Sequence, residues 1–206
     1  MTNKALSNNV NQKALNTIRE MGGTVRTTEA VQYGVHPRTL YQLRDSGDLQ
    51  TLSRGVYRLS ELDEPSEPDL VIIAKRIPRA VICLVSALAY HELTTQVPHT
   101  ISIALPKGAE TPRVTHPPIT VHRFSEEALN QGIETHQIDG VAVHVYCPEK
   151  TLADCFKFRN KLGMDIVLEG LKLYRSRKRV NVEQLMAYAR VCRVEKIMRP
   201  YLEAIL

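Results

Sequence analysis

Between residues 24 and 59 the hydrophobic and polar positions follow first a helical and then a strand-like spacing. Two short helices are predicted, joined at Gly34, because Pro37 suits the first turn of a second helix. Two short apolar runs follow, separated by a turn in which Arg54 precedes Gly55, and glycine favours the positive φ of a tight hairpin. Two helices followed by a hairpin predict a winged helix-turn-helix, a fold that places its second helix in the DNA major groove.

The predicted second helix separates its apolar and polar residues onto opposite faces. At about 100° per residue, Leu40 and Leu43 share one face, which we expect to be buried. The residues that project from the other face are then Arg38, Tyr41, Gln42 and Asp45. Arginine and glutamine can each pair bidentately with a purine edge, so this face is able to read bases. The alternative is an ordinary solvated helix face, but the surrounding elements favour DNA contact.

The predicted hairpin carries cations at its turn and on its returning strand. Arg54 stands at the tip and Arg58 follows it, where a cation suits phosphate or minor-groove contact. The alternative is a charge that only keeps the hairpin soluble. At the other end of the segment, Thr27 is expected to cap the first helix with its hydroxyl.

Charge is unevenly distributed along the 206 residues. Residues 1–60 carry eight basic and four acidic side chains, whereas residues 61–69 carry five acidic and no basic ones. Residues 148–206 carry thirteen basic side chains against seven acidic ones. We interpret residues 61–69 as an acidic linker between a winged helix-turn-helix domain, residues 1–60, and a second domain, residues 70–206. Basic ends of this kind attract polyanionic partners.

The second predicted domain shows strand patterns first and helical patterns after. Runs such as TISIALP and ITVHRF predict short strands, and Asp139 followed by Gly140 predicts a hairpin turn. From Pro148 onward the apolar spacing is wholly helical. The fold class is therefore predicted to be α+β, with a mixed α/β C-terminal domain that ends in helices.

Composition excludes several classes of protein. No stretch approaches the roughly 20 apolar residues of a membrane span, and the N-terminus lacks the hydrophobic core of a secretion signal. We therefore expect a cytoplasmic protein without a membrane partner. The four cysteines form no C-x-x-C pair and are expected to be buried free thiols. Because the seven histidines have no companions at ligand spacing, no metal and no cofactor are predicted.

A metal-dependent nuclease is the first alternative function. The residues that suggest it are Asp139, Glu149, Lys150 and Asp154. The hairpin turn already explains Asp139, the first helical turn after Pro148 explains Glu149, and Lys150 is expected to be exposed. The glycine-serine turn of nucleotidyltransferases and the glycine loop of Walker-type enzymes are both absent. We therefore expect no enzyme.

The second alternative is an interaction module that never binds nucleic acid. A basic cluster at the end of a predicted helix bears on this choice; its members are Arg175, Arg177, Lys178 and Arg179. These charges either remain solvated, where they also favour the C-terminal end of the helix dipole, or form an accessory contact to DNA or to a partner protein.

Three segments resemble the AbiEi-type antitoxins, the DNA-binding halves of bacterial type IV toxin–antitoxin systems in viral defence. They are RGVYRL at 54–59, SALAYHELTTQVPHTISIALPKG at 86–108 and CPEKTLADCFKFRNKLGMDIVLEGLK at 147–172, so that the resemblance extends over nearly the whole chain. It implies an N-terminal winged helix that binds inverted repeats in its own promoter, and a C-terminal domain that supports antitoxin action. The implied functional partner is a nucleotidyltransferase-like toxin from the same operon.

Residues and resemblance together predict a transcriptional repressor that acts as the antitoxin of an abortive-infection system. The alternative is a stand-alone regulator or interaction module without a cognate toxin. Pairing of two copies on two half-sites of double-stranded DNA is the expected route to useful affinity. The predicted DNA contacts are Thr27, Thr28, His36, Arg38, Thr39, Tyr41, Gln42, Arg44, Arg54 and Arg58.

Overall fold

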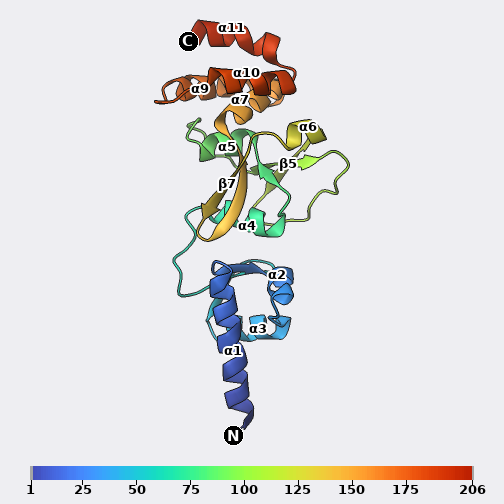
Figure 1. The fold of residues 1–206 in the computed structure, drawn as a ribbon, viewed down its shortest axis with the longest axis vertical. Coiled ribbons are helices and arrows are strands. Elements are labelled where there is room, and N and C mark those ends of the chain that lie inside the picture. Colours follow the sequence, from blue (N-terminus) through green and yellow to red (C-terminus); the bar gives the residue numbers. More distant parts are fainter. Residues whose placement is uncertain (1, 206) are drawn as a thin grey trace. The chain divides into compact units, whose positions relative to one another are not determined.

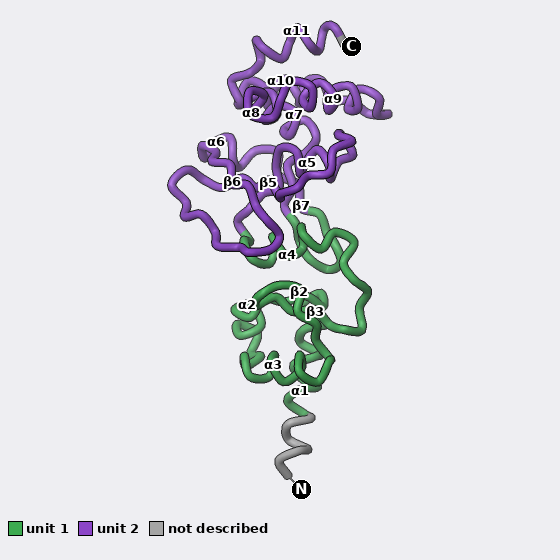
Figure 2. The backbone as a smooth tube through the Cα atoms, turned by 180° about the vertical axis from the view of Figure 1, so that it is seen from behind, with its two compact units in different colours: residues 1–78, 136–143 green, residues 79–135, 144–206 purple. Residues whose placement is uncertain are grey.

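The computed structural model describes residues 2–205, with side chains from residue 9 to residue 204. Two compact units follow from its contacts (Figure 2). The first unit contains Met1–Pro78 together with His136–Val143, and the second contains Arg79–Thr135 together with His144–Leu206.

The first unit contains three helices and a small antiparallel sheet, followed by a fourth helix (Figure 1). The helices are α1 (Thr2–Glu20), α2 (Thr27–Gln32), α3 (Pro37–Asp45) and α4 (Pro68–Arg76). The strands are β1 (Thr24–Arg26), β2 (Leu49–Ser53) and β3 (Val56–Leu59), paired in the order β1-β3-β2. Ile18, Val25, Leu40 and Leu43 are fully buried in its core, which confirms the predicted apolar face of the second helix.

Local chemistry accounts for these elements. Gly34 and Gly55 both adopt positive φ, of 82° and 75°, where the chain leaves α2 and where it turns between β2 and β3. Pro37 begins α3, and the Nδ1 atom of His36 accepts a hydrogen bond from a first-turn amide at 3.1 Å. The expected cap at Thr27 is wrong, because Thr27 is already the first helical residue of α2.

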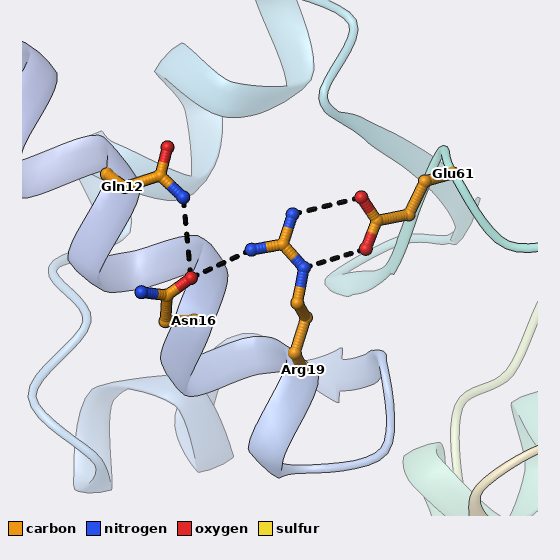
Figure 3. A network of polar contacts seen from close by, with 4 residues as sticks. All are labelled: Gln12, Asn16, Arg19 and Glu61. Atoms are coloured by element: carbon orange, nitrogen blue, oxygen red, sulfur yellow. Dashed lines mark hydrogen bonds and ion pairs between the residues drawn. The ribbon is translucent and has the colours of Figure 1, made fainter.

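The contacts divide the chain differently from the predicted domains at 1–60, 61–69 and 70–206. The acidic segment bonds to α1, since Glu61 accepts two hydrogen bonds from Arg19, at 2.7 and 2.9 Å (Figure 3). Helix α4 belongs to the first unit as well, where Lys75 forms an ion pair with Glu29 of α2 at 3.1 Å. Both pairs join segments that are grouped in the first unit. That residues 70–206 act as a separate functional module stays a prediction.

A five-stranded mixed sheet has the order β6-β5-β4-β8-β7, and most of it belongs to the second unit, whereas residues 136–143 of its β7–β8 hairpin are grouped with the first. Its strands are β4 (Val81–Ile82), β5 (Ile101–Pro106), β6 (Ile119–Phe124), β7 (Ile133–Ile138) and β8 (Val141–Tyr146). Strand β5 runs parallel to β6, and β4 runs parallel to β8 but antiparallel to β5. The predicted hairpin turn between β7 and β8 is present at Asp139, whose φ is 48°.

Helices make up the rest of this unit, which confirms the mixed α+β class with a helical C-terminal end (Figure 1). They are α5 (Leu84–Tyr90), α6 (Glu126–Leu129), α7 (Pro148–Lys157), α8 (Arg159–Leu162), α9 (Met164–Arg175), α10 (Val182–Val191) and α11 (Glu195–Ile205). Helix α7 packs against α5, α9 and α10, and its residues 150–156 are all buried. It is therefore the central helix of the second core.

The prediction that Lys150 is exposed is wrong. Its side chain is fully buried, and its Nζ atom lies 2.5 Å from Oδ2 of Asp154, one helical turn further along α7. Nζ also lies 4.1 Å from the ring centroid of Tyr146 and 5.1 Å from that of Phe124. Cys192 donates its thiol hydrogen to the other carboxylate oxygen of Asp154 at 3.1 Å. The pair is buried because α7 is covered on several sides, so its charges do not mark a solvated face.

The four cysteines are buried and free, as expected from their spacing. Burial raises the pKa of the Cys147 thiol to about 11 and that of the Cys192 thiol to about 12. Across residues 2–205, no helix combines the length and apolar character needed to cross a membrane. The same residues contain no group of three or more potential metal-ligating side chains.

Candidate nucleic-acid interface

Helix α3 presents the polar face that its spacing predicted. Arg38, Tyr41 and Gln42 are exposed on it, whereas Leu40 and Leu43 on the opposite face are fully buried. The buried leucines attach the helix to the core of the first unit, so the exposed side chains project from a fixed backbone. Tyr41 is a large side chain that remains 45% exposed.

Arg44, one turn further along α3, is held by its neighbours. Its Nε and Nη2 atoms donate to Oδ1 of Asp45 at 2.9 and 2.6 Å, and its guanidinium lies 5.3 Å from the ring centroid of Tyr41. The hydrogen bonds to Asp45 raise the pKa of the Arg44 guanidinium. Arg44 therefore remains charged and oriented, but a phosphate has to compete with Asp45 for it.

The β2–β3 turn is anchored through its backbone carbonyls. The carbonyl oxygen of Gly55 accepts hydrogen bonds from the amide of Thr27 at 2.9 Å and from its hydroxyl at 3.3 Å. The carbonyl oxygen of Arg54 accepts a hydrogen bond from Nη1 of Arg76 at 2.5 Å. Thr27 thus secures the turn and does not cap its own helix. The Arg54 side chain is exposed at the tip.

Two predicted DNA contacts are inside the protein. Arg58 is 4% exposed, and it donates from Nε to the carbonyl of Asp63 at 3.0 Å and from Nη1 to the hydroxyl of Thr24 at 2.8 Å. It lies on β3, the central strand, all four residues of which are buried. Thr39 is 6% exposed because it lies on the inner side of α3. Neither side chain is placed to touch DNA, so both predicted contacts are wrong.

The other predicted contacts lie at or near the surface. His36 is exposed, but its Nδ1 atom caps α3 by accepting from the Arg38 amide, so its role in the structure is to begin the helix. Thr28 is exposed and Thr27 is partly exposed, at the start of α2. The structure thus keeps both threonines beside the hairpin turn.

Several of these residues line a single open concavity, which we call the basic hollow. Its lining residues are Arg26, Thr27, Thr28, Tyr41, Arg44, Thr51, Arg54, Gly55, Tyr57 and Arg76. The hollow brings together five of the predicted contacts from α2, α3 and the hairpin, whereas Arg38 and Gln42 lie outside its lining. Sequence reasoning missed Arg26 and Arg76. Arg76 was assigned to the second domain, and only the long-range bonds of α4 show where it lies.

The basic cluster at the end of α9 is heterogeneous. Arg177 is partly buried and donates a hydrogen bond to the carbonyl of His91, which gives it a structural role. Arg175, Lys178 and Arg179 are exposed. An accessory contact to DNA or to a partner protein by these three residues stays a prediction.

The four residues that suggested a nuclease each have a structural partner. Asp139 lies in the hairpin turn of the first unit, and Glu149 accepts a hydrogen bond from the Tyr174 hydroxyl at 2.5 Å. Lys150 and Asp154 are paired with each other and fully buried. Each carboxylate thus has its own hydrogen-bond or ion-pair partner. That the chain is not a nuclease stays a prediction.

Comparisons with known proteins give one family match. A family model described as transcriptional regulator, AbiEi antitoxin, matches residues 12–60. No curated protein matches the chain. The similar solved structures include the crystal structure of the RV2827C protein from Mycobacterium tuberculosis, which is 16% identical, with a TM-score of 0.48. That alignment covers 92% of this chain and 79% of that chain.

The matched range includes α2, α3 and the β2–β3 hairpin, and therefore the RGVYRL segment at 54–59. The segments at 86–108 and 147–172 lie outside it, so the resemblance of the C-terminal part stays a prediction. Over residues 12–60, this chain is similar to the AbiEi antitoxin family of transcriptional regulators.

Proposed function

We propose that this protein is a DNA-binding transcriptional repressor whose α3 helix enters the major groove. The observation that carries the proposal is the exposed face of α3, where Arg38, Tyr41 and Gln42 stand on a helix fixed by two buried leucines. The helix pair and the anchored hairpin correspond to the parts of a winged helix-turn-helix. The match to a family of transcriptional regulators over the same residues supports this function.

Repression would follow from occupancy of a promoter. Contacts to phosphates set the register of the protein on the duplex, and contacts to base edges select the sequence. Arg38 and Gln42 are the residues whose chemistry fits purine edges, and Arg54 fits phosphate or the minor groove. We propose that the operator is an inverted repeat in the protein's own promoter, bound by two copies on its half-sites.

Titration of fluorescent duplexes with the full chain tests this function. One duplex carries the native upstream region, and the other carries the same bases in scrambled order. Specific recognition predicts a preference for the native duplex of about 10³-fold or more at physiological salt. Equal affinity for both duplexes would contradict a sequence-reading role.

We further propose that the protein is the antitoxin of a type IV toxin–antitoxin system. The family description supports the assignment, and the toxin's nucleotidyltransferase-like chemistry would belong to another chain. Co-expression with the neighbouring gene product tests it through rescue of growth. A DNA-binding-deficient full chain, Arg38→Ala with Gln42→Ala, is the matched control, because it separates antitoxin action from repression. Growth arrest that persists with the wild-type chain would contradict the antitoxin role.

A stand-alone regulator without a toxin is the second candidate, and the adjacent reading frame discriminates between the two. In both cases we propose a cytoplasmic regulator without catalytic activity or cofactor. The separate engagement of Asp139, Glu149 and Asp154 supports the absence of a nuclease site. Incubation with duplex DNA and Mg²⁺ tests this point, and cleavage by the purified chain would contradict it.

A further inference from the structure

The proposed reading of bases by the exposed face of α3 does not account for the arginines that line the basic hollow. Four arginines from separate elements line it: Arg26 at the end of β1, Arg44 on α3, Arg54 at the hairpin tip and Arg76 at the end of α4. Among the described residues that line the hollow, none is acidic. Asp45, which forms an ion pair with Arg44, lies outside this lining, so the lining itself carries a strong excess of positive charge.

The remaining lining residues add hydrogen-bond donors between these charges. Thr28 and Thr51 contribute hydroxyls from α2 and β2, and Tyr41 contributes a phenol from α3. Guanidinium groups combined with hydroxyl donors are the side chains that bind phosphate oxygens in protein–DNA complexes. The chemistry that this surface recognises is therefore a phosphate.

The walls of the hollow are tied together by bonds that do not need a ligand. Nη1 of Arg76 donates to the carbonyl of Arg54, and Thr27 donates twice to the carbonyl of Gly55. Next to Arg76, Lys75 lies 3.1 Å from both carboxylate oxygens of Glu29 and is only 11% exposed. Helix α4 and helix α2 thus each bond to a backbone carbonyl of the hairpin turn. A phosphate would meet a preformed site, so its binding carries no cost for ordering the turn.

We infer that the basic hollow binds a backbone phosphate of the DNA duplex, with Arg26 and Arg76 as direct contacts. This inference rests on the proposed DNA-binding function and extends it. Helix α4, which begins within the acidic segment, then belongs to the DNA-binding interface. Contacts in the hollow are independent of base sequence, so they contribute affinity and register but no discrimination.

Salt-dependent binding of full-chain variants tests the inference. Arg26→Ala and Arg76→Ala are titrated with the native upstream duplex and its scrambled form between about 50 and 200 mM salt. Each variant should weaken binding to both duplexes by the same factor and reduce the slope of log K against log salt by about 0.9 for each phosphate that the variant no longer neutralises. Arg190→Ala is the charge-matched control, since Arg190 is exposed on α10, in the second unit. Unchanged slopes, or reductions equal to that of the control, would overturn the inference.

Two further arms separate binding from structure. Arg76→Ala also removes the bond to the Arg54 carbonyl, but Arg76→Lys retains the charge and should restore most of the slope. Arg26→Ala leaves that bond in place and should still reduce the slope. Inorganic phosphate at matched ionic strength should not displace the duplex; specific displacement would show a site for free phosphate and overturn the DNA assignment.

The outcomes distinguish this inference from the function on which it rests. If the Arg38 and Gln42 variants lose discrimination while Arg26→Ala and Arg76→Ala keep the wild-type slope, α3 reads DNA and the hollow does not bind it. If the salt slopes of Arg26→Ala and Arg76→Ala fall while the α3 variants still discriminate the native from the scrambled duplex, the hollow binds phosphate. The proposal that α3 docks through its exposed face is then wrong. A full chain that binds neither duplex overturns both.

Discussion

At the residue scale, Asp139 stands in the left-handed turn of the β7–β8 hairpin, where its carboxylate accepts two hydrogen bonds from Ser66. The Ser66 amide and hydroxyl both donate to Oδ2 at 2.8 Å. Together these bonds lower the pKa of the Asp139 carboxyl. Because the pKa is lowered on folding, the stabilisation is present above the unfolded pKa of about 3.9 and is lost as the pH falls through the folded pKa.

We expect an NMR titration to place the midpoint of Asp139 below about 3.9. Ser66→Ala should raise this midpoint only in part, because the amide of residue 66 remains a donor. Ser60→Ala is the control, since Ser60 is exposed and makes no contact with Asp139 among the described interactions. A midpoint at or above about 3.9 in the wild type would contradict the predicted role of Ser66.

The charged side chain of Arg58 stabilises the fold and is not placed to contact DNA. Its guanidinium satisfies the Thr24 hydroxyl and the Asp63 carbonyl inside the first unit. Arg58→Ala should lower the free energy of unfolding by about 1–3 kcal/mol, the cost of leaving buried partners unsatisfied. Arg54→Ala should leave stability nearly unchanged but flatten the salt dependence of DNA binding by about one unit. Urea unfolding measures the stability of both variants, and DNA titration measures the salt dependence of their binding. A flattened salt dependence with unchanged stability in Arg58→Ala would show that Arg58 contacts DNA.

At the scale of elements, α7 is organised around a buried ion pair. Removal of one partner leaves the other charge uncompensated in the core, so Lys150→Met or Asp154→Leu alone should cost about 3–5 kcal/mol. The double variant should cost much less than the sum of the two. Burial already raises the pKa of the Asp154 carboxyl, and loss of the Lys150 ammonium should raise this pKa further.

Urea unfolding of the single and double variants measures the coupling in α7. The matched control is Arg199–Glu195 of α11, which has the same i,i+4 spacing but whose arginine is 57% exposed. Breaking that pair should change the free energy of unfolding by only about 0.3–0.5 kcal/mol. Additive effects at Lys150 and Asp154 would show that the buried pair does not act as a unit.

Elements fixed by local chemistry were predictable from the sequence. Gly34, Pro37 and Gly55 located α2, α3 and the hairpin turn, because each of them meets a backbone requirement of its own position. Burial of charged residues was not predictable, since a lysine and an aspartate four residues apart also describe a solvated helix face. Lys150 is buried only because other helices cover α7.

The residues of the candidate site likewise fall into those that local sequence predicts and those that depend on long-range contacts. The exposed face of α3 followed from helical spacing and is present in the structure. Arg26 and Arg76 were missed because their position depends on contacts between segments that are distant in sequence, such as the pair of Lys75 with Glu29. The burial of Arg58 was not predicted. Strand β3 lies between two other strands and all four of its residues are buried, but the sequence of so short a strand does not show this.

At the scale of the whole molecule, recognition of an inverted repeat requires two copies. A single module of this size buries modest surface on DNA, and occupation of two half-sites squares the selectivity of one. Sedimentation of the full chain with a duplex containing both half-sites should give two protein copies per duplex. A duplex with one half-site scrambled is the control and should bind one copy with lower affinity. One copy on the intact repeat would contradict a symmetric operator.

The central claim is that the exposed face of α3 reads base sequence. The most direct measurement is the ratio of affinities for the native upstream duplex and its scrambled form, compared between the wild type and the variant with Arg38→Ala and Gln42→Ala. Loss of Arg38 alone should weaken binding to the native duplex by about 1–3 kcal/mol. We expect the double variant to lose most of the discrimination while it keeps the wild-type salt dependence from the phosphate contacts. An unchanged ratio in a folded double variant would contradict the claim.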